Sequence, residues 1–102
     1  MTEEDAEETR ARLGAELNHA FESSDAIRIS KAIAEALREF NITRVAEQSG
    51  LSRPTVHRAF TSADLPRLST VLAVLDAIGF RLRIEKSKSS SWRANLARKS
   101  RR

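Results

Sequence analysis

The sequence predicts an all-α domain of five helices followed by one C-terminal β-strand. Apolar residues recur every three or four positions through residues 13–78, which is the spacing of helices that bury one face. From Phe80 to Glu85 apolar and charged residues alternate, which is the period of a half-buried strand. The 102 residues are enough for one small domain with extensions.

The first two helices are predicted from their capping residues and their apolar stripes. Thr2 is followed by three acids, which stabilise the positive end of the helix dipole, and the helix should end near Ser23. Asp25 is a good N-cap for a second helix of about fifteen residues. The first stripe consists of Leu13, Leu17 and Phe21. The second consists of Ile29, Ile33, Ala36, Leu37 and Phe40.

Two short helices are expected next. One covers residues 42–49, and its N-cap is either Asn41 or Thr43. The other starts at Ser52 and runs to about Phe60, and with Ser52 counted as the N-cap Pro54 is its second helical residue. Proline is tolerated there because the N–H groups of the first turn have no partner within the helix.

A fifth helix is expected after a loop over residues 61–66, and Gly79 should end it. Its predicted buried residues are Leu68, Val71, Leu72, Leu75 and Ile78. The strand over residues 80–85 needs a partner for its backbone groups, and a second copy of the chain is the simplest source. The sequence therefore predicts a homodimer with paired strands. Its candidate dimerisation residues are Leu75, Ile78, Phe80, Leu82 and Ile84.

Residues 42–60 have the pattern of a helix-turn-helix, in which two short helices cross and the second enters the major groove of DNA. Ala46 is small enough for a close crossing, and Gly50 supplies the positive φ that the turn requires. The residues expected to fix the crossing angle from inside are Val45, Leu51, Val56 and Phe60. The alternative interpretation is an ordinary helical hairpin.

The outer face of the second helix carries the candidate base-reading residues. Arg53 and Arg58 suit bidentate contacts to guanine O6 and N7, and Thr55 and Pro54 suit contact with a thymine methyl group. The alternative for both arginines is a solvated helix face. Ser52 and the other helix starts suit phosphate contacts. The full set of candidate DNA-contacting residues is Asn41, Thr43, Arg44, Ser52, Arg53, Pro54, Thr55, His57 and Arg58.

Charge divides the chain into an acidic N-terminal helix (1–24), the helix-turn-helix domain with its strand (25–85) and a basic flexible tail (86–102). Residues 1–25 hold eight acids and two arginines, giving −6, whereas the tail holds seven bases and no acid. This asymmetry predicts different partners for the two ends, with nucleic acid favoured at the basic end.

Both ends leave two interpretations open. The acidic run from Glu3 to Glu8 either mimics RNA phosphates and caps a basic ribonuclease cleft, or is a solvated terminus. Trp92 either fixes the tail on a partner or belongs to a disordered tail with non-specific phosphate contacts.

Composition excludes several classes of protein. Cysteine is absent, which excludes disulfides and thiolate metal sites. No apolar run reaches the roughly 20 residues of a membrane span. His19 and His57 have no cluster of acids around them, so no metal is expected. The sequence has no nucleophile pair and no glycine-rich phosphate loop, so we expect neither an enzyme nor a cofactor. We expect a cytoplasmic, nucleoid-associated protein.

The helix-turn-helix domain predicted above resembles the Xre/HigA-type antitoxin family of bacterial addiction modules, including prophage-type DNA-binding proteins. The resemblance runs from Asp25 to Ile84 and is carried by Ser24-Asp25, residues 32–37, Val45-Ala-Glu-Gln-Ser-Gly-Leu-Ser-Arg53, Pro66 and residues 71–79. It implies a lambda-repressor-like helix-turn-helix fold, a dimer, repression of the protein's own operon and neutralisation of a RelE/HigB-like ribonuclease toxin. It also assigns DNA contact to Arg53, Thr55 and Arg58.

The chain departs from the family pattern in two places. Asp64-Leu65 precede Pro66 where the family usually has Gly-Asn, and the tail after Ile84 is longer and more basic. Two alternative functions stay open: a solitary phage-like transcriptional regulator, and a protein-interaction module with a degenerate helix-turn-helix.

Overall fold

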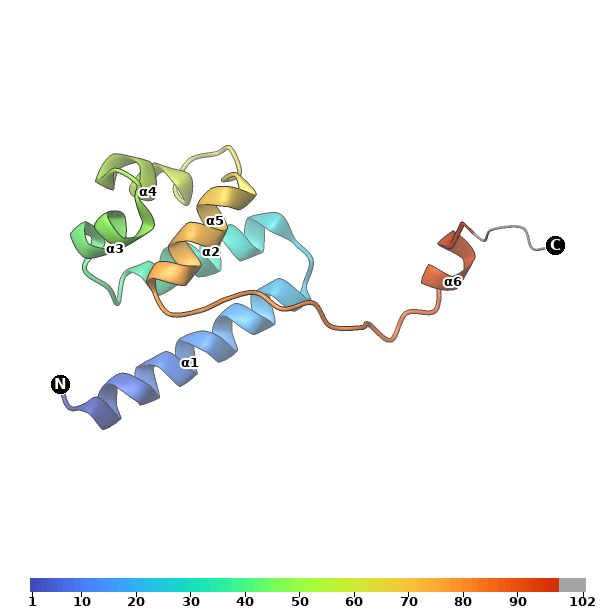
Figure 1. Cartoon of the computed structure of the whole chain (residues 1–102), viewed down its shortest axis with the longest axis horizontal. Helices are drawn as coiled ribbons and strands as arrows, with labels where there is room; N and C mark the ends of the chain where they lie inside the picture. Colours follow the sequence, from blue (N-terminus) through green and yellow to red (C-terminus); the bar gives the residue numbers. More distant parts are fainter. Residues whose placement is uncertain (98–102) are drawn as a thin grey trace.

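The computed structural model describes residues 1–97, and six helices form within them. Their bounds are α1 Glu3–Glu22, α2 Ala26–Leu37, α3 Ile42–Ser49, α4 Arg53–Ala59, α5 Leu68–Ala77 and α6 Trp92–Asn95. Helices α2 to α5 gather into one cluster, α1 lies along its side, and the segment after α5 leads away to α6 (Figure 1). The predicted helical class is confirmed, with one short helix more than expected.

Side-chain caps fix the start of the first four helices. Thr2 and Asp5 form a capping box, in which the Thr2 hydroxyl accepts from the Asp5 N–H at 3.1 Å and the Asp5 carboxylate accepts from the Thr2 N–H at 3.3 Å. Asp25 caps α2 in the predicted way. Asn41, not Thr43, caps α3: its Oδ1 accepts from the N–H groups of the second and third helical residues at 3.0 and 3.2 Å.

Helix α2 is shorter than predicted, with 12 residues. After Leu37 the backbone tightens, and the N–H groups of Arg38, Glu39 and Phe40 donate to carbonyls three residues earlier, each at 3.1 Å. This 3₁₀-type turn keeps Phe40 against the core, so the apolar spacing continues beyond the end of the α-helix.

The core lies between all five of the first helices. Its fully buried side chains include Leu13 from α1, Ile33 from α2, Val56 from α4, and Val74 and Leu75 from α5. Helix α1 packs on α2, while α3, α4 and α5 pack on one another. The acidic N-terminal helix therefore shares the core of the helical cluster.

The predicted buried face of α5 was wrong at two positions. Leu68 is 67% exposed and Leu72 is 45% exposed, whereas Val74, which was not predicted, is fully buried. Leu68 follows the stripe but stands in the first turn of α5, where neighbouring helices no longer cover it. Leu72 lies at the edge of the apolar stripe, where it is partly open to solvent. Periodicity locates a stripe, but the neighbouring helices decide how much of it is covered.

Helix α1 also holds the end of α5. A Cβ at Gly14 would lie 3.2 Å from Cε1 of Phe80, so the missing side chain lets the phenyl ring pack on the α1 backbone. The Arg10 guanidinium donates to the Gly79 carbonyl at 3.5 Å.

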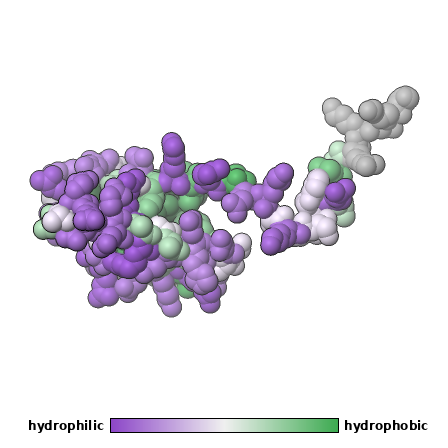
Figure 2. Space-filling model, turned by 90° about the horizontal axis from the view of Figure 1, so that it is seen from below, coloured by the Kyte–Doolittle hydropathy of each residue, from purple (hydrophilic) through white to green (hydrophobic). Residues whose placement is uncertain are grey.

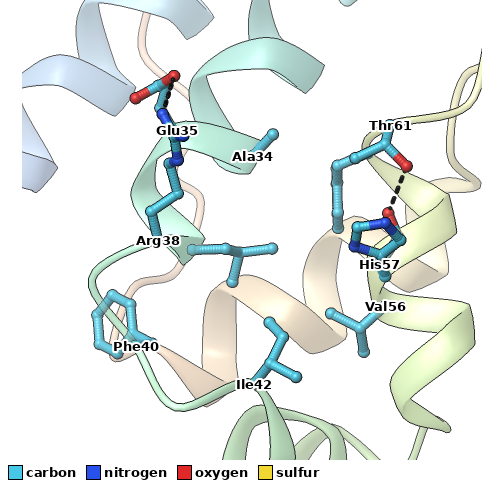
Figure 3. Close-up of a pocket in the computed structure, with 10 residues that line it drawn as sticks. Ala34, Glu35, Arg38, Phe40, Ile42, Val56, His57 and Thr61 are labelled. Carbon is cyan, nitrogen blue, oxygen red and sulfur yellow. Dashed lines mark hydrogen bonds and ion pairs between the residues drawn. The ribbon is translucent and has the colours of Figure 1, made fainter.

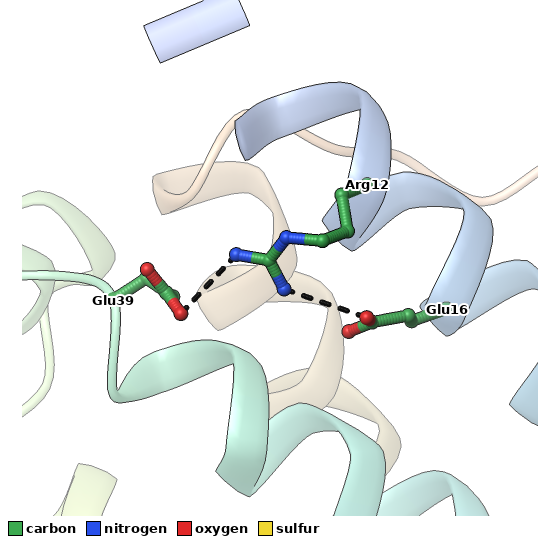
Figure 4. A network of polar contacts seen from close by, with 3 residues as sticks. All are labelled: Arg12, Glu16 and Glu39. Carbon is green, nitrogen blue, oxygen red and sulfur yellow. Dashed lines mark hydrogen bonds and ion pairs between the residues drawn. The ribbon is translucent and has the colours of Figure 1, made fainter. Parts of the chain in front are cut away.

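Arg12 of α1 bridges two carboxylates, those of Glu16 at 3.4 Å and Glu39 at 3.3 Å (Figure 4). The hydrogen bond to Glu39 is the largest cause of the raised pKa of Arg12.

Residues 80–85 form no strand within the part of the chain that the structure describes. A strand needs a paired neighbour, and a single chain offers none here, so pairing across a dimer stays a prediction. The five candidate dimerisation residues lie at different depths in the single chain. Leu75 and Ile78 are 2% and 4% exposed, because the protomer's own core covers them. Leu82 and Ile84 are exposed, and Phe80 is half-buried against α1.

The tail contains a helical turn that the sequence did not predict. Helix α6 spans four residues, and every described residue from 81 to 97 is exposed. Residues 98–102, which belong to the predicted flexible tail, lie outside the described residues. Within residues 1–97, no helix combines the length and the apolar character that crossing a membrane requires.

Candidate nucleic-acid interface

A short turn at Gly50 joins α3 to α4. Gly50 has φ +77° and ψ 13°, the left-handed conformation that glycine adopts without strain. The Leu51 N–H donates to the Ala46 carbonyl at 3.1 Å and the Gly50 N–H donates to the Glu47 carbonyl at 3.4 Å. These are the two hydrogen bonds of a Schellman motif, which ends α3 and turns the chain. Ser52 then caps α4.

Buried side chains set the two helices against each other. Val45 and Ala46 of α3 and Val56 of α4 are 3%, 5% and 0% exposed, and Leu51 packs on the same core from the turn. The predicted inner residues of the motif therefore meet as expected. With one face of α4 held by Val56, its opposite face is directed to solvent.

The structure places all nine candidate DNA-contacting residues on the exposed surface of α3, α4 and their caps. Two of them are linked to each other: the hydroxyl oxygens of Ser52 and Thr55 lie 2.7 Å apart, and the Ser52 oxygen also accepts from the Thr55 N–H at 3.2 Å. Asn41 uses its Oδ1 to cap α3. These three are therefore partly engaged in local structure.

The arginines of this surface have no carboxylate partner among the described residues, a property that Arg28 of α2 and Arg67 before α5 share. Arg10, Arg12 and Arg38 each lie within 4 Å of a carboxylate. Among the described residues, Arg44, Arg53 and Arg58 have no such ion pair, and Glu47 is the one acid on α3 and α4. An arginine without a carboxylate partner keeps five N–H donors for an anion or a base edge.

Sequence reasoning missed a hollow beside this surface. A cavity of about 520 Å³ opens between the C-terminal half of α2 and the end of α4 (Figure 3). His57 and Thr61 line one side, where the Thr61 hydroxyl donates to the His57 carbonyl at 2.8 Å. Glu35 and Arg38, 3.2 Å apart, line the other. No sequence pattern marks this hollow, because its walls come from separate stretches of the chain.

His19 and His57 lie on α1 and α4 respectively. Over residues 1–97, no group of three or more histidine, cysteine, aspartate or glutamate residues is placed to hold a metal ion.

Comparison with known proteins points to one family. The family described as "Probable addiction module antidote protein" matches residues 4–86, from the first turn of α1 to just beyond the alternating segment. A protein of Haemophilus influenzae described as "Uncharacterized protein" is 24% identical over 72 residues, which cover 71% of this chain and 74% of that protein. No solved structure matches the chain. The family match covers most of the sequence, and the chain therefore belongs to the addiction module antidote family.

Proposed function

We propose that this antidote protein binds operator DNA through α3 and α4, represses its own operon as a homodimer, and neutralises a RelE/HigB-like ribonuclease toxin. Membership of the antidote family identifies an antitoxin of an addiction module, with a toxin partner of some kind. DNA binding goes beyond the family and rests on the observations below, whereas autorepression and the RelE/HigB-like class of toxin rest on the resemblance to the Xre/HigA-type family. In this proposal the protein is a cytoplasmic binding protein at the nucleoid, with no catalytic activity of its own.

The observation that carries DNA binding is the pair Arg53 and Arg58 on α4. Both are exposed and, among the described residues, free of ion pairs, while Val56 buries the opposite side of the same helix. The seven residues of α4 span roughly 10 Å, which fits a major groove about 12 Å wide. Arg58 faces away from Val56, and Arg53 reaches past the first turn, so both suit contacts to guanine.

The caps of α3 and α4 suit the phosphates on either side of the groove. Ser52 and Asn41 stand at the two helix starts, where backbone N–H groups and the helix dipole favour an anion. Arg44 in the first turn of α3 is exposed and adds a positive charge. Such contacts fix the register of a protein on the duplex, whereas the base edges supply the specificity.

A homodimer completes the operator complex. In the single chain, Leu82 is 41% exposed and Ile84 is fully exposed. Pairing residues 80–85 with the same residues of a second copy would satisfy their backbone groups and cover these apolar side chains. Two copies of α4 would then read half-sites about one helical turn apart, roughly 34–36 Å.

Helix α1 supplies the surface that fits a ribonuclease toxin. Its first six residues include the acids Glu3, Glu4, Asp5, Glu7 and Glu8, all exposed. A protein that binds RNA presents a basic surface, and an acidic helix complements it. Helix α1 buries Leu13, Leu17 and Ala20 against the domain, and its polar contacts with the domain begin at Arg10. The acids from Glu3 to Glu8 precede these contacts and are exposed to a partner.

Footprinting on the DNA upstream of the protein's own gene tests repression. Growth rescue on co-expression with any small basic protein encoded next to that gene tests neutralisation. We expect paired protected half-sites and restored growth. Protection without rescue by any neighbouring gene product would instead indicate a solitary regulator. Rescue without protection would indicate an antitoxin that does not bind its own promoter, and the DNA-binding proposal would be wrong.

A further inference from the structure

A line of basic residues follows the segment that leaves the domain after α5. We define it as the basic track: Arg81, Arg83, Lys86, Lys88 and Arg93. We propose that the basic track is an arm that binds the sugar–phosphate backbone of duplex DNA flanking the half-site read by α4. This inference rests on the proposed DNA binding and adds a second contact, outside the operator.

The basic track has no carboxylate partner within the described residues. Each of its side chains is exposed, and none lies within 4 Å of a carboxylate there, in contrast to Arg10, Arg12 and Arg38 on the domain. Hydrogen bonds after Lys86 are local, such as that from the Ser89 N–H to the Ser87 hydroxyl at 3.3 Å. The sequence has no acid after Glu85. The track is therefore available to an external polyanion.

The segment also has the reach that flanking contacts require. It extends from the helical cluster to α6 (Figure 1), and the molecule measures 62 Å along its longest axis against 31 and 23 Å across. At about 3.3–3.6 Å per extended residue, the segment from Arg81 to Arg93 reaches at most roughly 43–47 Å. At 3.4 Å per base pair this corresponds to about 13 base pairs, which exceeds one helical turn. Figure 2 shows this segment as mostly hydrophilic, with small apolar spots.

Two observations favour DNA over the toxin as the occupant. The match to the antidote family ends at residue 86, so Lys88 and Arg93 lie outside the region that the family shares. The acidic half of α1 points to the opposite end of the molecule from α6 (Figure 1), so the basic track lies apart from the surface proposed for the toxin. In α6 the Arg93 guanidinium lies 5.2 Å from the centroid of the Trp92 ring, which restricts the directions it takes.

The test compares salt dependence on two duplexes. An operator is selected from a randomised pool with the full chain, and is then used either alone or with about one helical turn of unrelated sequence, roughly 10 base pairs, on each side. The full chain should bind the long duplex more tightly and with a steeper salt dependence. Lys86→Gln with Lys88→Gln should reduce the slope of log K against log salt by about 1.8 on the long duplex, at about 0.9 per lost phosphate contact, and leave it unchanged on the short one.

Arg28→Gln with Lys31→Gln is the matched control, because it removes the same charge from the exposed face of α2 and should leave both slopes unchanged. Equal slopes for the full chain and the Lys86/Lys88 variant on the long duplex would overturn the proposal. So would equal losses on both duplexes. The preference for operator over scrambled DNA of the same length reports on α4 alone. If the full chain still prefers operator over scrambled DNA but its salt dependence is the same with and without flanking DNA, the arm proposal is wrong and the proposed function stands.

Discussion

Replacing Gly50 by alanine should destabilise the domain through the backbone alone. At φ +77° an added Cβ meets no atom within 4 Å, so no steric contact enters the comparison. The left-handed conformation costs an L-residue roughly 1–2 kcal/mol. Alanine also lowers the conformational entropy of the unfolded chain, which stabilises the folded state by about 0.4–1 kcal/mol. The expected net loss in the free energy of unfolding is about 1 kcal/mol.

Thermal unfolding followed by far-ultraviolet circular dichroism measures this loss. For a domain of this size, 1 kcal/mol lowers Tm by roughly 4–8 °C. Gly50→Asn should lower Tm by less than Gly50→Ala does, because asparagine tolerates the left-handed region better than alanine does. Gln48→Ala, an exposed substitution within α3, is the control and should not lower Tm, since alanine favours a helix. If Gly50→Ala unfolds at or above the wild-type temperature, the turn does not depend on the positive φ.

Further substitutions test the packing and the dimer. Leu75→Ala should lower the free energy of unfolding by about 2–5 kcal/mol, because the side chain is fully buried. Leu72→Ala should change it by only about 0.5 kcal/mol, because this side chain is exposed. Denaturant titration measures both, and similar losses would mean that Leu72 is buried as periodicity predicted. Leu82→Pro removes a backbone donor from the segment proposed to pair across the dimer, so light scattering should report monomers. Circular dichroism should show the helices intact in this variant, and an unchanged dimer would exclude strand pairing as the interface.

The sequence predicted best the features that are encoded locally. The bounds of α3, the capping by Asp25 and Ser52 and the turn at Gly50 each depend on residues within a few positions of one another. The choice of Asn41 over Thr43 as the cap depended on side-chain geometry, which composition alone does not contain.

Features set by distant neighbours were harder to predict. Periodicity put Leu68 and Leu72 on the buried face, but the helices packed around α5 cover Val74 instead. The hold of α1 on Phe80 depends on Gly14, which carries no apolar signal of its own. The predicted strand over residues 80–85 would need a second chain to pair with, so a single protomer does not test it.

Base reading by Arg58 is the step on which sequence-specific repression depends. Competition binding of Arg58→Ala should show an operator affinity lower by about 1–3 kcal/mol, with little change on scrambled DNA of equal length. Arg28→Ala removes an exposed arginine from α2 and should preserve the ratio of the two affinities. If Arg58→Ala weakens operator and scrambled DNA equally, Arg58 contacts phosphate rather than a base, and α4 does not read sequence through it.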